Sequence, residues 1–190
     1  TLEEICDLVI AENETRSADE KKLYVMYDQI YWTLTFDGIQ HHDPVSLRPK
    51  MKEYTIFVDG ISKAFAATGV RVGWSMGPEI IMGKMKAINS HVGSWAPMAE
   101  QKAVARFLQD ENAVDEYLSH FKTEVSKRLE QLYQGIIELK SKGFTVDAIK
   151  PQAAIYLTVQ FDLKGKKTEH GNVLDTQEKV TNYLLDEAKL

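Results

Sequence analysis

Residues 60–74 of the chain read GISKAFAATGVRVGW, with one lysine, Lys63, among small residues and one arginine, Arg71, eight positions later. Apolar runs rich in β-branched and aromatic residues lie on both sides, at residues 54–58 and 70–76, as is typical of short strands. The link between them is too short to hold a crossover helix, so we expect the two strands to pair antiparallel. Lys63 would then follow the end of a buried strand. Small neighbours let a flat ligand approach its amine, and burial favours the neutral, nucleophilic form of an amine.

A second informative run lies upstream, at residues 23–28, and reads LYVMYD. It is almost continuously apolar, as expected of a parallel strand that is buried on both faces. The run ends in Asp28, and Tyr31 follows three residues later. Ligands of open α/β sheets bind at the carboxyl ends of strands, which is where Asp28 would lie. Asp is also common in caps and turns, so the residues themselves leave both roles open for Asp28.

The rest of the chain alternates between helical and strand patterns. A capping box at Thr1 and Glu4 opens a first helix that should fade near residues 13–16. Proline opens two further helices after residues 77 and 96, and Gly93 should stop the first of these two. A long apolar stripe follows from residue 112 to Gly143, then strands near 144–146 and 155–161 and a last helix from 176. We therefore predict an α/β fold: part of a mostly parallel sheet with its last strand antiparallel, flanked by helices, and then part of a small α+β C-terminal domain.

Composition narrows the class of protein. The chain has 190 residues, a net charge of −5 and 44% hydrophobic residues, which is an ordinary composition for a globular protein with a sizeable core. The mildly acidic net charge does not indicate nucleic-acid binding, and no apolar run is long enough to span a membrane. The single cysteine, Cys6, fits a reducing compartment, so we expect a cytoplasmic protein. His41, His42 and Asp43 are adjacent, but neighbouring side chains point apart, so we predict no metal site there.

These residues carry a family resemblance. The run GISKAFAATGVRVG is similar to the pyridoxal-phosphate attachment site of the class I aminotransferases, in which Ser-Lys is followed by small positions and then by Gly, Arg and Gly. Asp28 and Tyr31 stand where this family carries an Asp-x-x-Tyr pair before its lysine. Residues 150–156, KPQAAIY, also resemble the family, with Ala153 in place of the usual glycine. The resemblance spans essentially the whole chain, although family members are much longer.

The resemblance implies a fold-type-I pyridoxal-phosphate aminotransferase that moves an amino group between an amino acid and a 2-oxo acid, of the aspartate type or related. Lys63 would form the internal Schiff base and then act as the acid and base that moves the α-proton. Asp28 would pair with the pyridine nitrogen and keep it protonated, so that the ring can accept electrons. Tyr31 would hydrogen-bond the phenolic oxygen of the ring.

The phosphate of the cofactor would be held by a further part of the same motif. Arg71 would grip it as a planar fork. The family often has serine three residues before the lysine, also on the phosphate, but Gly60 stands at that position here. That contact is therefore lost or supplied by Ser62.

Segments that the family uses elsewhere are missing from this sequence: a Gly- or Ser-rich turn before a phosphate-binding helix, and the C-terminal arginine that clamps the substrate carboxylate. We therefore expect residues 1–111 to be the C-terminal half of a large cofactor-binding domain, and residues 112–190 a connecting helix with a partial small domain. Such a piece should not transaminate by itself. It should leave the strand near Tyr24 as a sheet edge, which invites association into homodimers.

Other functions remain compatible with the same residues. Within enzymes, the alternative is another reaction on the same cofactor, such as that of a β-lyase or a decarboxylase. From a different class, the alternative is the effector domain of an aminotransferase-like transcription regulator. A binding module that keeps the fold without the cofactor is disfavoured by the joint presence of Asp28, Tyr31, Lys63 and Arg71.

Overall fold

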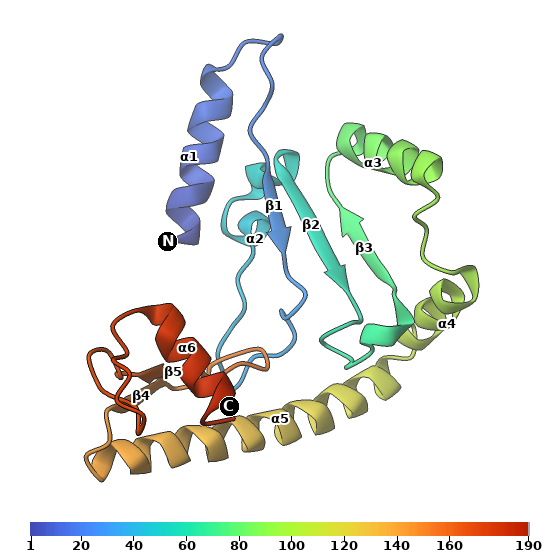
Figure 1. Cartoon of the computed structure of the whole chain (residues 1–190). Helices are drawn as coiled ribbons and strands as arrows, with labels where there is room; N and C mark the ends of the chain where they lie inside the picture. The colour runs from blue at the N-terminus through green and yellow to red at the C-terminus, as the bar shows by residue number, and fades with distance from the viewer. Residues whose placement is uncertain (190) are drawn as a thin grey trace. The chain divides into compact units, whose positions relative to one another are not determined.

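A computed structural model describes residues 1–189 (Figure 1). The chain divides into two compact units. The first unit comprises Thr1–Val125 with Gln152–Ala154, and the second comprises Ser126–Pro151 with Ile155–Leu190. The boundary falls inside the 31-residue helix α5 (Glu111–Ser141). None of the helices within the described residues has the length and hydropathy needed to cross a membrane.

The sheet of the first unit has the order β1-β2-β3. Strands β1 (Val25–Asp28) and β2 (Thr55–Gly60) pair parallel, and β3 (Gly73–Met76) returns antiparallel to β2, as the arrows in Figure 1 show. The predicted α/β class and the antiparallel third strand are confirmed, and β1 is an edge strand in the described part of the chain. The methionine of β1, Met26, is 74% exposed.

Strand β3 is shorter than the run at residues 70–76 that we predicted. Thr68–Val70 forms the 3₁₀ helix η2, and Arg71 adopts the left-handed conformation with φ +61° and ψ +38°. A left-handed residue cannot continue an extended backbone, so pairing with β2 starts only at Gly73. The apolar pattern alone does not reveal this turn.

Helix α1 (Leu2–Thr15) begins with the predicted capping box between Thr1 and Glu4. Its inner face buries Cys6 and Val9 against Met51, and Val25 of β1 packs on the same cluster. Met51 belongs to the 3₁₀ helix η1 (Pro49–Glu53), which follows the short helix α2 (Pro44–Leu47). The segment that holds α2 and η1 is therefore packed against α1 and β1.

Asp43 has a structural role at the start of α2. Its Oδ1 accepts hydrogen bonds from the backbone N–H groups of Val45 at 2.9 Å and Ser46 at 3.0 Å. Ser46 Oγ lies 3.3 Å from the Asp43 backbone N–H and completes a capping box. The carboxylate beside the two histidines is thus an N-cap.

Two further helices follow β3. Helix α3 (Glu79–Val92) ends at the left-handed residue Gly93, as predicted, and α4 (Met98–Leu108) leads to α5. Val104 of α4 is buried with Ile61 and Val72, the residues that flank the loop between β2 and β3. The loop that carries Lys63 is therefore anchored on the helical layer.

The second unit is a small α+β arrangement. Strands β4 (Val146–Ile149) and β5 (Thr158–Phe161) pair antiparallel, and α6 (Gln177–Asp186) is capped by Thr176. Leu129 of α5 and Leu174 are buried. Both strands begin later along the chain than the apolar runs suggested, at residues 146 and 158.

The contact between β2 and β3 requires a pair of glycines, which gives a first prediction. A Cβ added at Gly60 would lie 2.9 Å from both Gly73 Cα and Val72 O, which are backbone atoms that cannot yield. We expect Gly60→Ala to lower the free energy of unfolding by roughly 1–3 kcal/mol, measured by urea denaturation. The control is Gly83→Ala in α3, where nothing lies within 4 Å and helix propensity should raise stability by about 0.5–1 kcal/mol. Equal stability of Gly60→Ala and the parent chain would contradict this packing.

Candidate functional site

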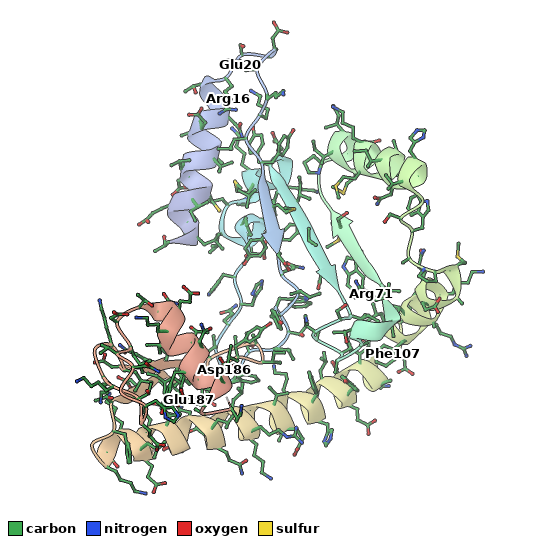
Figure 2. The ribbon with its side chains drawn as sticks, viewed as in Figure 1. Arg16, Glu20, Arg71, Phe107, Asp186 and Glu187 are labelled. Carbon is green, nitrogen blue, oxygen red and sulfur yellow. The ribbon has the colours of Figure 1, made fainter. Side chains whose placement is uncertain are left out.

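Three of the sequence-predicted site residues lie at one end of the sheet of the first unit. Asp28 ends β1 opposite Val58, and β2 runs two residues further to Gly60, with Lys63 three positions beyond. Gly60 pairs with Gly73, so Arg71, two positions before Gly73, lies at the same end. Figure 2 labels Arg71 there, where β3 begins. Parallel pairing of β1 with β2 and the tight return of β3 therefore bring these three residues to a common edge.

Asp28 presents an exposed carboxylate at the carboxyl end of β1. Its Oδ1 accepts a hydrogen bond from the backbone N–H of Ile30 at 3.0 Å, which fixes the carboxylate in an Asx turn. Its other oxygen has no hydrogen-bond partner within residues 1–189. One oxygen thus orients the group, and the other is available to a ligand.

Tyr31 lies in a double turn just after β1. The backbone N–H of Trp32 donates to Gln29 O at 2.9 Å, and that of Leu34 donates to Tyr31 O at 2.9 Å. The backbone of Gln29 also donates to Val58 O at 3.0 Å, which continues the β1–β2 ladder into the turn. Tyr31 is half-buried. The position of its backbone therefore depends on how this turn is held against β2.

Lys63 lies in the loop that leaves β2. Backbone hydrogen bonds from Phe65 to Ile61 O at 3.2 Å and from Ala66 to Lys63 O at 3.1 Å fold the loop into a compact turn. Tyr117 of α5 donates its hydroxyl to Phe65 O at 2.9 Å and stacks on the Phe65 ring. The loop is therefore rigidly held, while the half-buried Lys63 makes no side-chain hydrogen bond or ion pair in the described part of the chain.

Ser62, the other candidate in this loop, is half-buried. Its hydroxyl makes no hydrogen bond within the part of the chain that the structure describes. The structure places Ser62 beside Lys63 and shows no further contact that distinguishes it from an ordinary loop serine.

Arg71 is held in an uncommon backbone conformation. Its φ of +61° is costly for a residue with a Cβ, roughly 1–2 kcal/mol. The guanidinium is exposed, and its Nη1 donates to Thr68 O at 2.9 Å. Its Nε and Nη2 donate to no group among residues 1–189. Strained residues persist where a side chain is needed at that place, so Arg71 is a strong candidate for ligand binding.

Asp59 is a site residue that the sequence analysis missed. It is only 7% exposed, and its Oδ2 accepts from Trp32 Nε1 at 2.9 Å and from Gln29 Nε2 at 3.4 Å. Its Oδ1 accepts from the backbone N–H of Gly60 at 2.7 Å. The sequence does contain one indication of this role: Asp59 is an acid at the end of an otherwise apolar run, directly before Gly60.

An open groove of about 860 Å³ lies on the sheet face that carries Phe57 and Met76. Side chains alternate along a strand, and Asp28 is paired with Val58, so Asp28 belongs to the opposite face. Two buried polar atoms at this groove, Thr33 Oγ1 and His41 Nε2, have no hydrogen-bond partner among the described residues. The groove is therefore separate from the edge where Asp28, Lys63 and Arg71 gather.

The family profile described as "Aminotransferase class I and II" matches residues 1–190, the whole of this sequence. The chain belongs to the class I and II aminotransferase family. This confirms the resemblance inferred from residues 60–73.

Individual members of the aminotransferase family show the same relationship. A protein of Rickettsia bellii described as a probable aspartate/prephenate aminotransferase is 32% identical over 167 residues, 87% of this chain and 40% of the relative. The aspartate aminotransferase of Geobacillus stearothermophilus is 31% identical over 134 residues, 70% of this chain and 32% of the relative. The crystal structure of the aromatic aminotransferase from Pyrococcus horikoshii has a TM-score of 0.77 at 26% identity, covering 99% of this chain and 44% of that one. The chain thus spans less than half the length of these relatives.

The burial of His41 gives a pH-dependent prediction. Burial lowers the pKa of the His41 imidazole below its ordinary value of 6.5, as does His42, although the Asp43 and Asp59 carboxylates oppose the shift. The unfolded chain then binds a proton more readily than the folded chain, so stability falls as the pH drops below about 6.5. We expect the free energy of unfolding to decrease from about pH 7.5 to 5.5, with a smaller decrease in His41→Phe.

The control for this measurement is His120→Gln, which removes an exposed imidazole from α5. This variant should keep the pH profile of the parent chain. A His41→Phe profile identical to that of the parent would show that the His41 ring does not carry the effect.

Proposed function

We propose that this chain is the cofactor-binding part of a pyridoxal-phosphate-dependent aminotransferase. The observation that carries the proposal is that Asp28, Lys63 and Arg71 lie at one end of the sheet, each with polar side-chain atoms that make no hydrogen bond within residues 1–189. Membership of the aminotransferase family supports the same reading. Tyr31 and Ser62 lie in the two turns that adjoin this edge.

The chemistry of these groups fits the cofactor. Pyridoxal phosphate carries an aldehyde, a ring nitrogen and a phosphate, and the edge offers an amine, a carboxylate and a guanidinium in matching roles. Lys63 would hold the group covalently through Nζ, and Asp28 would accept the ring N–H with the oxygen that Ile30 leaves unoccupied. Arg71 would bind the phosphate through Nε and Nη2, a charge-assisted fork.

When bound, the cofactor supplies an electron sink for the carbanion of the substrate. Asp28 would accept a hydrogen bond from the ring N–H and so favour the protonated ring nitrogen. Tyr31 would donate its hydroxyl to the phenolic oxygen, and Ser62 would be a second donor for the phosphate. Lys63 Nζ would take the proton from the substrate α-carbon and return it, and its rigid loop would position the amine for that transfer.

For the whole protein we propose amino transfer between an amino acid and a 2-oxo acid, with an aspartate-type or related substrate. The relatives named for aspartate, prephenate and aromatic substrates support this range. We also propose a cytoplasmic homodimer.

Covalent capture tests the cofactor assignment. The 190-residue chain is incubated with pyridoxal phosphate, treated with borohydride, digested and examined by mass spectrometry. We expect a modified peptide at Lys63, absent in Lys63→Ala and retained in Lys84→Ala, which removes an exposed lysine of α3. Capture spread over surface lysines with no preference for Lys63 would overturn the proposal.

Arg71 gives a matched test of phosphate binding. In Arg71→Gly the relief of left-handed strain, roughly 1 kcal/mol, offsets the greater freedom of glycine in the unfolded chain, so stability should be retained. Removal of the guanidinium should raise the concentration of pyridoxal phosphate needed for half-saturation about tenfold or more, since hydrogen bonds to charged groups contribute ~1.5–3 kcal/mol. The concentration of pyridoxal, which lacks the phosphate, needed for half-saturation should not change. An equal loss for both ligands would refute phosphate binding by Arg71.

A further inference from the structure

We propose that Asp59 is a positioning residue whose carboxylate fixes the turn from Gln29 to Trp32, and so sets Tyr31 with respect to Lys63. The role rests on the proposed function, because it concerns the geometry in which Tyr31 and Lys63 meet the cofactor. Asp59 acts through the turn and is not assigned a contact with the ligand.

The geometry links two elements that carry site residues. Asp59 ends the apolar part of β2, four residues before Lys63. Its Oδ2 accepts from Trp32 Nε1 at 2.9 Å and from Gln29 Nε2 at 3.4 Å, the first and last residues of the turn that contains Tyr31. One buried side chain therefore ties the turn after β1 to the strand that leads to Lys63.

Asp59 holds this turn from the far side of the sheet. Asp28 is paired with Val58, so these two residues share one face, while Asp59 belongs to the other. Its hydrogen-bond partners Gln29 and Trp32 line the groove on that other face. The carboxylate is therefore placed to support the turn without occupying the edge where Asp28 receives a ligand.

The contact requires a carboxylate and not merely a polar group. All three groups that reach Asp59 are N–H donors: the Trp32 indole, the Gln29 amide and the Gly60 backbone. A carboxylate accepts on both oxygens, whereas an asparagine amide would turn an N–H₂ group toward one of the donors. A buried donor left without an acceptor is costly, so Asp59→Asn should displace the turn although it preserves the shape.

This reasoning defines a double-variant experiment. Asp59→Asn should raise the concentration of pyridoxal phosphate at which half of Lys63 is captured by about tenfold or more, because small misplacements of site groups are costly. Trp32→Phe, which removes one donor and keeps an aromatic ring, should cost less. In Trp32→Phe/Asp59→Asn only the Gln29 amide still faces the N–H₂ group introduced at position 59, and by rotating, the Gln29 amide can present its oxygen as an acceptor, so most of the lost affinity should return. Capture is compared under conditions in which circular dichroism shows each variant to be folded.

A second measurement does not depend on the cofactor. The chain is labelled with 3-fluorotyrosine, and the Tyr31 signal is assigned by its loss in Tyr31→Phe. We expect Asp59→Asn to shift or broaden the Tyr31 fluorine signal, and the double variant to restore it. The signal of Tyr133, which lies in the second unit, should stay constant throughout.

The outcomes separate the two proposals. A Tyr31 signal that is unchanged in Asp59→Asn overturns the positioning role, and so does a double variant as impaired as Asp59→Asn. Absence of capture at Lys63 in the parent chain overturns the cofactor assignment, and the fluorine signals then decide the role of Asp59 alone. Weaker capture and a changed Tyr31 signal in Asp59→Asn, both restored in the double variant, support the positioning role of Asp59.

Discussion

The parallel pairing of β1 with β2, in which Asp28 lies opposite Val58, is the constraint on which the first unit depends. Parallel strands end at the same edge, so the residues that follow them emerge together. The tight antiparallel return to β3 adds Arg71 to that edge, because Gly60 faces Gly73. A shift of one residue between β1 and β2 would move Asp28 to the opposite face and separate it from Lys63.

The sequence was informative wherever local pattern and tertiary structure agree. The capping box at Thr1, the stop at Gly93 and the antiparallel return of the third strand all follow from periodicity and turn chemistry. Residues 60–73 also carried the family assignment, which the match over residues 1–190 confirms. Lys63 could be selected because it is the one lysine among small residues after an apolar strand.

What the sequence could not reveal depends on contacts between distant segments. Asp59 is set by donors from Gln29 and Trp32, about thirty residues away, and no local pattern reports them. The left-handed backbone of Arg71 is equally hidden, because arginine has no preference for positive φ. From the sequence, a metal site at Asp43 could be excluded but no role could be assigned to this carboxylate, because its capping of Val45 and Ser46 depends on where the short helix begins.

The candidate site combines rigidly held turns with polar side-chain atoms that make no hydrogen bond within residues 1–189. The Lys63 loop is fixed by Tyr117 and by burial of Ile61, and the turn after β1 is fixed by Asp59. A ligand that meets such groups loses little free energy to ordering them, which is how preorganised sites bind and position their ligands. The strain at Arg71 and the close approach of Gly60 to Gly73 are costs of the same arrangement. They are sustained because the sheet and the helical layer determine the backbone there.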